Sequence, residues 1–244
     1  MPSTAVADRL GTITIPSRFN GPPGSANGGF TCGIVAGWLA ADPVEVTLRS
    51  PPPLEKRLDV ESTGAGVALR DGDTLIADAS PAELELALPE PPSLALASEA
   101  ARAGYEGWSE THPFPTCFVC GPDRNPGDGL RIFPGRLPGS ELWAADWTPD
   151  ASLVHDGTVR ADHVWAALDC PTSAPVANFG SGPPIVLGRL TATIHGDVEP
   201  ERPHVMLSWP LGINGRKRES AAALFDSDGW RLAEARAVWI ELRS

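Results

Sequence analysis

Two apolar segments rich in alanine and glycine most constrain what this chain can fold into. Residues 27–40 read NGGFTCGIVAGWLA, and residues 159–175 read VRADHVWAALDCPTSAP. Each has the composition of a helix that is apolar on nearly every side, and such a helix must be buried. In the first, glycines recur at positions 29, 33 and 37 and leave a bare face for another backbone. Because three glycines weaken an isolated helix by roughly 1 kcal/mol each, we expect the two helices to face each other inside a wrapping sheet.

Strand patterns accompany each of the two helices in the same order. The first helix is preceded by a β-branched run at 12–15 and followed by strand patterns at 44–50, 54–62 and 67–86. The second is preceded by strand candidates at 129–133 and 141–147 and followed by strand patterns at 186–198, 204–210 and 219–243. The segments LRDGDTLIADA (69–79) and LFDSDGWRLAEA (224–235) align after one inserted residue. This repetition indicates an internal duplication.

The duplication divides the chain into two units and a connector. We expect an N-terminal unit at 1–88, a connector at 89–116 and a C-terminal unit at 117–244. The connector begins with a proline-rich stretch and contains a short helical piece at 94–103. A chain of 244 residues has room for two units of this size.

Composition and charge exclude several classes of function. The formal net charge of −12 leaves no general basic face for phosphates, so neither DNA nor RNA is expected as a partner. The chain does not open with a basic segment and an apolar run, and no apolar stretch reaches the roughly 18 residues of a membrane span. Two of the four cysteines lie inside helix candidates, which indicates reduced thiols. We therefore expect a cytoplasmic protein without a membrane span.

Cys117 and Cys120, with His112 upstream, make half of a zinc-binding pattern. A structural zinc site needs four ligands, and no second pair of ligands stands elsewhere in the sequence. Redox chemistry at such a cysteine pair favours a helix N-terminus directly after the motif. From the sequence we expect no metal site.

The segment 117–132, CFVCGPDRNPGDGLRI, resembles the opening of many hotdog-fold acyl-CoA thioesterases of the phenylacetate-degradation (PaaI-like) and 4-hydroxybenzoyl-CoA thioesterase superfamily. In that family the central helix typically begins His-Gly-Gly and carries an Asp nine residues after the His. The resemblance implies an α+β fold, a double hotdog in which two antiparallel sheets each wrap around a central helix and form a pseudo-dimer.

Each half of the chain keeps a different part of the family's helix motif. Asn27, Gly28 and Gly29 stand at the His-Gly-Gly place, but Ala36 stands where the acid belongs. Asp169 fits the acid place in the second half, where the glycine pair is replaced. In single-unit relatives the two parts of one site come from different subunits. The resemblance therefore implies one complete site, made by Asn27 to Gly29 and Asp169.

These groups suit the hydrolysis of a thioester. Unpaired N–H groups at a helix start, here Gly28 and Gly29, can stabilise an oxyanion. Asp169 can act as a general base on water or as a nucleophile, and partial burial should raise its pKa. Pro171 should kink or end the helix just beyond it. In the other interpretation, the glycines serve close packing alone and Asp169 hydrogen-bonds the turn at 172–173.

Further candidates surround this site. Asn20 lies near the place where relatives carry an Asn that orients the water or the carbonyl group. Thr191, on a following strand, is a candidate to face the acid. The densest basic cluster of an acidic protein, Arg216, Lys217 and Arg218, is a candidate to bind the phosphates of CoA. The other interpretation of this cluster is an ordinary exposed hairpin.

The resemblance thus implies an enzyme that hydrolyses an acyl-CoA or an acyl-carrier thioester. CoA enters as part of the substrate, no cofactor is expected, and the tandem chain would act as a monomer or a homodimer. Two alternatives stay open. The missing His at position 27 and Pro171 favour a non-catalytic protein that binds acyl-CoA or acyl chains. A hotdog enoyl-CoA hydratase is less favoured, because no helix carries a His at the required spacing from the acid.

Overall fold

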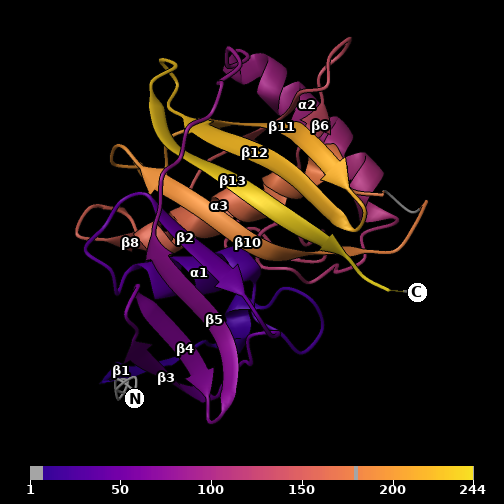
Figure 1. Cartoon of the computed structure of the whole chain (residues 1–244). Coiled ribbons are helices and arrows are strands. Elements are labelled where there is room, and N and C mark those ends of the chain that lie inside the picture. The colour runs from indigo at the N-terminus through magenta and orange to yellow at the C-terminus, as the bar shows by residue number, and fades with distance from the viewer. Residues whose placement is uncertain (1–7, 179–180, 244) are drawn as a thin grey trace.

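One antiparallel sheet of 11 strands organises the fold (Figure 1). The computed structural model describes residues 8–178 and 181–243; the first seven residues, which enter the expectation about a signal sequence, lie outside it. The strands are ordered β1-β3-β4-β5-β2-β10-β13-β12-β11-β7-β6. Their bounds are β1 Arg9–Thr14, β2 Val44–Leu48, β3 Arg57–Ser62, β4 Val67–Asp71, β5 Thr74–Pro81, β6 Gly135–Arg136, β7 Trp143–Trp147, β10 Ile185–Ile194, β11 His204–Asn214, β12 Lys217–Phe225 and β13 Arg231–Glu241. A separate two-stranded ribbon joins β8 (Val154–His155) to β9 (Thr158–Val159).

The two sets of strands that the sequence suggested as two sheets meet edge to edge. β2 pairs antiparallel with β10, with Val46 opposite Leu190. The ladder is therefore continuous from β1 to β6. Every strand segment expected from the sequence is present except residues 129–133. That prediction was wrong because the N–H groups of Leu130 and Ile132 donate to the carbonyls of Phe118 and Val119, at 2.8 and 3.0 Å, instead of joining the sheet.

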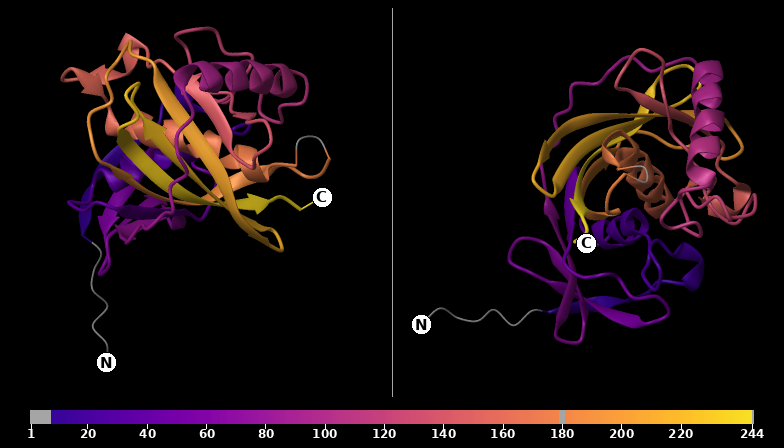
Figure 2. Two further views of the ribbon diagram at one scale, coloured as in Figure 1. Left: turned by 90° about the horizontal axis from the view of Figure 1, so that it is seen from above. Right: turned by 90° about the vertical axis from the view of Figure 1, so that its right-hand side faces the viewer.

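Two buried helices pack against each other on one face of the sheet (Figure 1). α1 spans Gly28–Ala36 and lies against β2, β5 and β10, whereas α3 spans Ala161–Ser173 and lies against β10 to β13. The sheet curves around α3, as the right-hand view of Figure 2 shows. Pro171 lies inside α3, which continues to Ser173, so of the two predicted effects, a kink or an end of the helix, the end does not occur. The described residues also form three short 3-10 helices, at Ser17–Phe19, Ala151–Leu153 and Ala174–Val176.

Glycines of α1 permit the close approach of α3. A Cβ atom on Gly33 would lie 2.7 Å from Asp162 Cα and 2.8 Å from Trp165 Cβ. A Cβ atom on Gly29 would lie 2.8 Å from the Trp165 carbonyl oxygen and would overlap Asp169. Gly37, the third glycine of the row, caps the C-terminus of α1 and has no such neighbour. The glycine face predicted from the sequence thus contacts another backbone at two of its three positions, and that backbone belongs to α3.

α2 covers the opposite face of the sheet. It spans Leu94–Ser109, six residues beyond the end expected for the helical piece of the connector, and packs on β6, β7 and β11. Successive residues of β11 point to opposite faces of the sheet. Val205 and Leu207 join the hydrophobic cluster under α2, while Met206 joins the hydrophobic cluster around α3. Within the described ranges, no helix has the length and apolarity needed to cross a membrane.

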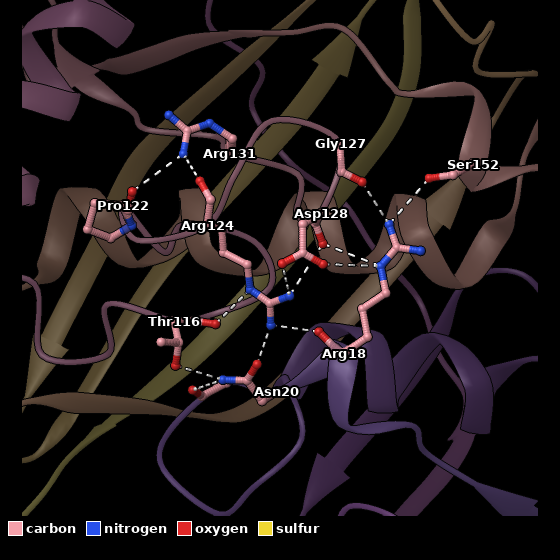
Figure 3. A network of polar contacts seen from close by, with 10 residues as sticks. Arg18, Asn20, Thr116, Pro122, Arg124, Gly127, Asp128, Arg131 and Ser152 are labelled. Atoms are coloured by element: carbon pink, nitrogen blue, oxygen red, sulfur yellow. Dashed lines mark hydrogen bonds and ion pairs between the residues drawn. The ribbon is translucent and has the colours of Figure 1, made fainter.

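Arg124 ties the loop after α2 to the N-terminal part of the chain (Figure 3). Its buried guanidinium group donates to the carbonyls of Thr116 (2.9 Å) and Arg18 (2.7 Å), and it also bonds the side chains of Asn20 and Asp128. Five N–H donors in a planar fork allow one arginine to serve several acceptors from different segments. This network fixes the loop 116–131 to the segment around Arg18 and Asn20, which precedes α1.

We predict that Gly33→Ala destabilises the protein although alanine favours helix. The new methyl group would force α1 away from α3, a change that typically costs about 1–3 kcal/mol and outweighs a gain of roughly 1 kcal/mol in helix propensity. Gly37→Ala is the matched control, because the nearest atoms to its Cβ would lie at 3.5 Å. Urea unfolding should show a loss for Gly33→Ala and none for Gly37→Ala. Equal effects would contradict the proposed helix contact.

Candidate functional site

A cavity of about 570 Å³ opens between α1, the end of α3 and the ends of β10 and β13. Its walls are largely apolar, with side chains that include Leu48, Trp108, Phe114, Leu187, Trp239 and Ile240. The Gly- and Pro-rich loop before α1 forms a further wall, as does the segment that follows α2. A cavity of this size, with few polar groups, is typical of a site for a small ligand.

Asp169 is a buried carboxylate in the wall of this cavity. It lies in the third turn of α3, its residue is 2% exposed, and its Oδ2 accepts hydrogen bonds from Asn27 Nδ2 and from Gly29 N, both at 2.9 Å. Among the described residues, none hydrogen-bonds the other oxygen, Oδ1. The predicted proximity of Asp169 to residues 27–29 is therefore confirmed, across 140 positions of sequence.

Asn27 contacts both the start of α1 and the carboxylate of Asp169. Its Oδ1 accepts from Phe30 N at 2.8 Å and caps the start of α1, while its Nδ2 donates to Asp169. An Asn cap satisfies a helix N–H that would otherwise be unpaired. The Asp169 carboxylate does not bond the turn at 172–173; instead Thr172 Oγ1 donates to the Asp169 backbone carbonyl at 2.6 Å. The alternative role considered for Asp169 is therefore not what the structure contains.

Burial raises the pKa of Asp169 to about 7. Desolvation is the main cause, because a charged carboxylate is poorly stabilised away from water. The hydrogen bonds from Gly29 and Asn27 favour the charged form and oppose this effect, while the nearby Cys117 adds to it. The carboxyl group can therefore accept or release a proton near neutral pH.

The two glycine amides of α1 have different roles. The N–H of Gly29 is already used by Asp169, so it does not face the cavity as a free donor. This departs from the expectation that both amides point at a substrate carbonyl. Gly28 lies in the cavity wall and is partly exposed, and within the described chain its N–H has no hydrogen-bond acceptor. Its missing Cβ also has a packing reason, because a Cβ would lie 2.9 Å from Leu187.

Asn20 and Thr191 lie away from the cavity wall. Asn20 belongs to the Arg124 network, where its Nδ2 donates to Thr116 Oγ1 at 3.1 Å (Figure 3). Thr191 Oγ1 donates to Glu45 Oε2 at 3.2 Å across the β2–β10 pair. Both side chains thus have structural partners, and the structure does not bring either one to Asp169.

The basic cluster divides into a paired and an exposed part. Arg218 bonds the carboxylate of Glu241 and donates to the Val176 carbonyl at 2.9 Å, so it is a structural cation. Arg216 and Lys217 are exposed in the hairpin between β11 and β12. Lys217 lies opposite Ile240, which lines the cavity. The hairpin therefore stands beside one end of the cavity.

Three cysteines and a histidine meet in the cavity wall. The sequence grouped Cys117, Cys120 and His112, but it did not suggest that Cys170 joins them. Cys170, next to Asp169 in α3, places its Sγ 3.7 Å from that of Cys117, and all three sulfurs of Cys117, Cys120 and Cys170 lie within 4.8 Å of one another. His112 Nε2 lies 3.2 Å from Cys120 Sγ. The available signal was that Cys170 follows the candidate acid in a helix expected to be buried.

We predict that Asp169→Asn stabilises the protein increasingly as the pH rises from about 4 to 7. Between these values the unfolded carboxyl group loses its proton while the folded group retains it, so the wild type loses stability as the pH rises. About three pKa units correspond to a decrease in the free energy of unfolding on the order of 4 kcal/mol above pH 7. A protein with the uncharged Asn at this position does not undergo this decrease. Free energies of unfolding from urea titrations at pH 4.5 to 8.5 should reveal this slope.

Asp162→Asn is the control for this measurement. Asp162 is also buried in α3, but bonds from His163 and Arg160 outweigh its desolvation and lower its pKa. Its replacement should give no gain at high pH. A stability difference between wild type and Asp169→Asn that does not change with pH would contradict the raised pKa.

Comparison with known proteins identifies the fold of this chain through solved structures. No protein-family model and no curated protein matches the chain. Among solved structures, the tesB protein of Mycobacterium avium subsp. paratuberculosis is similar over 97% of this chain and 96% of its own, at 13% identity and a TM-score of 0.61. A candidate thioesterase II from Thermobifida fusca is similar over 98% and 96%, at 14% identity and a TM-score of 0.60.

A third similar structure is a conserved protein with a hotdog fold from Alicyclobacillus acidocaldarius. The similarity covers 98% of this chain and 96% of that one, at 10% identity and a TM-score of 0.59. At such low identities the likeness concerns the fold alone, and it spans nearly the whole chain. The resemblance drawn from the sequence motifs is confirmed at the level of the fold: the chain has the hotdog fold.

Proposed function

We propose that this protein hydrolyses an acyl thioester to a free acid and a thiol, with Asp169 as the group that activates water. The observation that carries this proposal is the position of its carboxylate, buried in the wall of an apolar cavity and held through one oxygen by Asn27 and Gly29. The second oxygen, Oδ1, is buried and accepts no hydrogen bond from the described residues, and we assign it the proton of the attacking water. A base held in one orientation and poised near neutral pH is suited to general base catalysis.

In the proposed reaction, water attacks the thioester carbonyl carbon while Asp169 takes its proton. The carbonyl oxygen becomes an oxyanion, to which the N–H of Gly28 donates at the positive end of the α1 dipole. The C–S bond then breaks, the carboxylic acid forms, and the thiolate receives the proton. Direct attack by Asp169, with an anhydride intermediate, is the alternative chemistry. When water then attacks the Asp169 carbon of this anhydride, ¹⁸O from labelled water enters the Asp169 side chain during a single turnover.

We further propose that the chain forms a pseudo-dimer of two hotdog units, 1–88 and 117–244, with a single complete site. The first unit supplies Asn27 to Gly29 and the second supplies Asp169, which matches the complementary losses in the two helices. A symmetric second site would need an acid at Ala36 and a glycine pair at 161–162, and the sequence has neither. The four unpaired thiols support a reducing, cytoplasmic setting.

Asp169→Asn tests the proposed chemistry. We expect kcat for hydrolysis across a panel of acyl-CoA thioesters to fall at least about 100-fold, because removal of a general base typically costs that much. Release of CoA thiol with a chromogenic disulfide gives the rate. Asp162→Asn should retain activity within a few-fold, since Asp162 does not line the cavity. Unchanged hydrolysis by Asp169→Asn would remove the proposed base.

The main alternative is a protein that binds acyl-CoA without turnover. Binding of a long-chain acyl-CoA measured by calorimetry, with no hydrolysis by the wild type for any member of the panel, would favour it. Loss of enoyl-CoA absorbance on incubation with the protein would instead indicate a hydratase.

We propose that Arg216 and Lys217 contact the nucleotide phosphates of a CoA substrate. They are the exposed cations of the hairpin beside the cavity, and phosphate binding requires such groups. The double variant Arg216→Ser/Lys217→Ser should raise KM for acyl-CoA roughly 10-fold and leave kcat unchanged. The same acyl group on pantetheine, which lacks the nucleotide, is the control, and its KM should not change. Equal KM values for acyl-CoA in both proteins would exclude this role.

A further inference from the structure

The sulfurs of Cys117, Cys120 and Cys170 are arranged as the ligands of one metal ion would be. In a tetrahedral zinc site, Zn–S bonds of about 2.3 Å separate neighbouring sulfurs by about 3.8 Å. The Cys117 and Cys170 sulfurs lie 3.7 Å apart, and Cys120 Sγ lies within 4.8 Å of both. All three residues are at most 6% exposed, and they line the cavity wall.

Two side-chain N–H groups, from Asn27 and His112, are directed at these sulfurs. The Nδ2 of Asn27 lies 3.9 Å from Cys117 Sγ and 4.0 Å from Cys170 Sγ, in addition to its bond with Asp169. His112 Nδ1 accepts from Phe114 N at 2.9 Å, which leaves the ring proton on Nε2, directed at Cys120 Sγ. Thiols that pack merely as small apolar groups need no such donors. Donors of this kind stabilise thiolates, the form that binds metals.

In the turn that contains Cys117 and Cys120, backbone segments lie unusually close to each other at Gly121. Gly121 N donates to the Cys117 carbonyl at 2.9 Å, and a Cβ on Gly121 would lie 2.6 Å from both Cys117 N and the Pro115 carbonyl oxygen. Only glycine fits, so the turn brings Cys117 and Cys120 to the same side. α3 then supplies Cys170 from the other side.

We propose that Cys117, Cys120 and Cys170 bind one Zn²⁺ ion as thiolates, with the fourth coordination position facing the cavity. Three soft thiolate ligands suit zinc, and three protein ligands with one further position is a known zinc arrangement. His112 is assigned as a hydrogen-bond donor to Cys120, because its Nδ1 accepts from Phe114 and so its Nε2 carries the proton. This proposal does not depend on the proposed thioesterase activity.

The zinc ion would join two elements that matter for the candidate site. Cys170 directly follows Asp169 in α3, and the loop with Cys117 and Cys120 follows the segment that closes the cavity. A metal bound to all three would hold that loop against the helix end that carries the carboxylate. Because a ligand that binds only the folded state stabilises it, zinc should also raise the melting temperature.

Metal content of the reduced, purified protein is the first test. Mass spectrometry of the metals should find about one zinc per chain in the wild type and in Cys32→Ala, whose buried thiol lies outside the cluster. Cys117→Ala, Cys120→Ala and Cys170→Ala should each retain less than a tenth of that amount. Equal zinc loss in Cys32→Ala, or a different metal at this stoichiometry, would overturn the assignment.

A second test uses the wild-type protein and so does not depend on whether the variants fold. After removal of metal with a chelator under reducing conditions, Co²⁺ should produce a sulfur-to-cobalt charge-transfer absorption, which Zn²⁺ should abolish. Zn²⁺ should raise the melting temperature by roughly 5 °C or more. Absence of both signals in protein whose thiols are free by titration would refute the site.

His112→Ala separates a hydrogen-bond donor from a ligand. As a donor, His112 should contribute about 10- to 100-fold to zinc affinity without changing the cobalt spectrum. A shift of the cobalt d–d bands in this variant would make His112 a ligand and would overturn the proposed three-thiolate set.

Discussion

The close contact of α1 with α3 is the interaction on which the rest of this structure depends. It requires glycine at positions 29 and 33, where side chains would meet the backbone and Cβ atoms of α3. Such a contact removes two apolar helices from water and leaves the sheet free to curve around them. It also brings a carboxylate from one helix to the unpaired N–H groups at the start of the other. The packing of the fold and the geometry of the candidate site are thus one arrangement.

That arrangement has an energetic cost. A carboxylate that is 2% exposed loses its hydration, and two hydrogen bonds to one of its oxygens compensate only in part, which is why its pKa is raised. A protein selected for stability alone would place an apolar residue here. Retention of an acid with one oxygen directed to no protein group fits a site that sacrifices stability for chemistry. The cluster of thiols beside it, if it holds zinc, would offset some of that loss.

Much of the architecture could be predicted from the sequence, because hydrophobic periodicity and glycine spacing report local structure directly. The two buried helices, their mutual contact and every strand except the two-residue strands β6, β8 and β9 were accessible in this way. The edge-to-edge junction of β2 with β10 was not, since pairing between distant strands leaves no local pattern. The failed strand at 129–133 has the composition of a strand, but its N–H groups bond to the cysteine loop.

The candidate site likewise has features that local sequence predicts and features that depend on tertiary contacts. Asp169 could be named because an isolated acid in an apolar helix is a local signal, and Asn27 because it stands at the His-Gly-Gly place of the family motif. The use of the Gly29 amide by Asp169, the place of Asn20 in the Arg124 network and the arrival of Cys170 beside Cys117 depend on tertiary contacts. Spacing along the chain contains no information about such meetings.

A crystal structure with an acyl-CoA analogue in which CH₂ replaces the thioester sulfur tests the central claim most directly. The analogue keeps the carbonyl group but cannot be hydrolysed. The account predicts its carbonyl oxygen about 3 Å from Gly28 N, with Asp169 Oδ1 facing the carbonyl carbon across the space of one water molecule. An acyl carbonyl bound elsewhere in the cavity, with protein atoms between it and Asp169, would contradict the account.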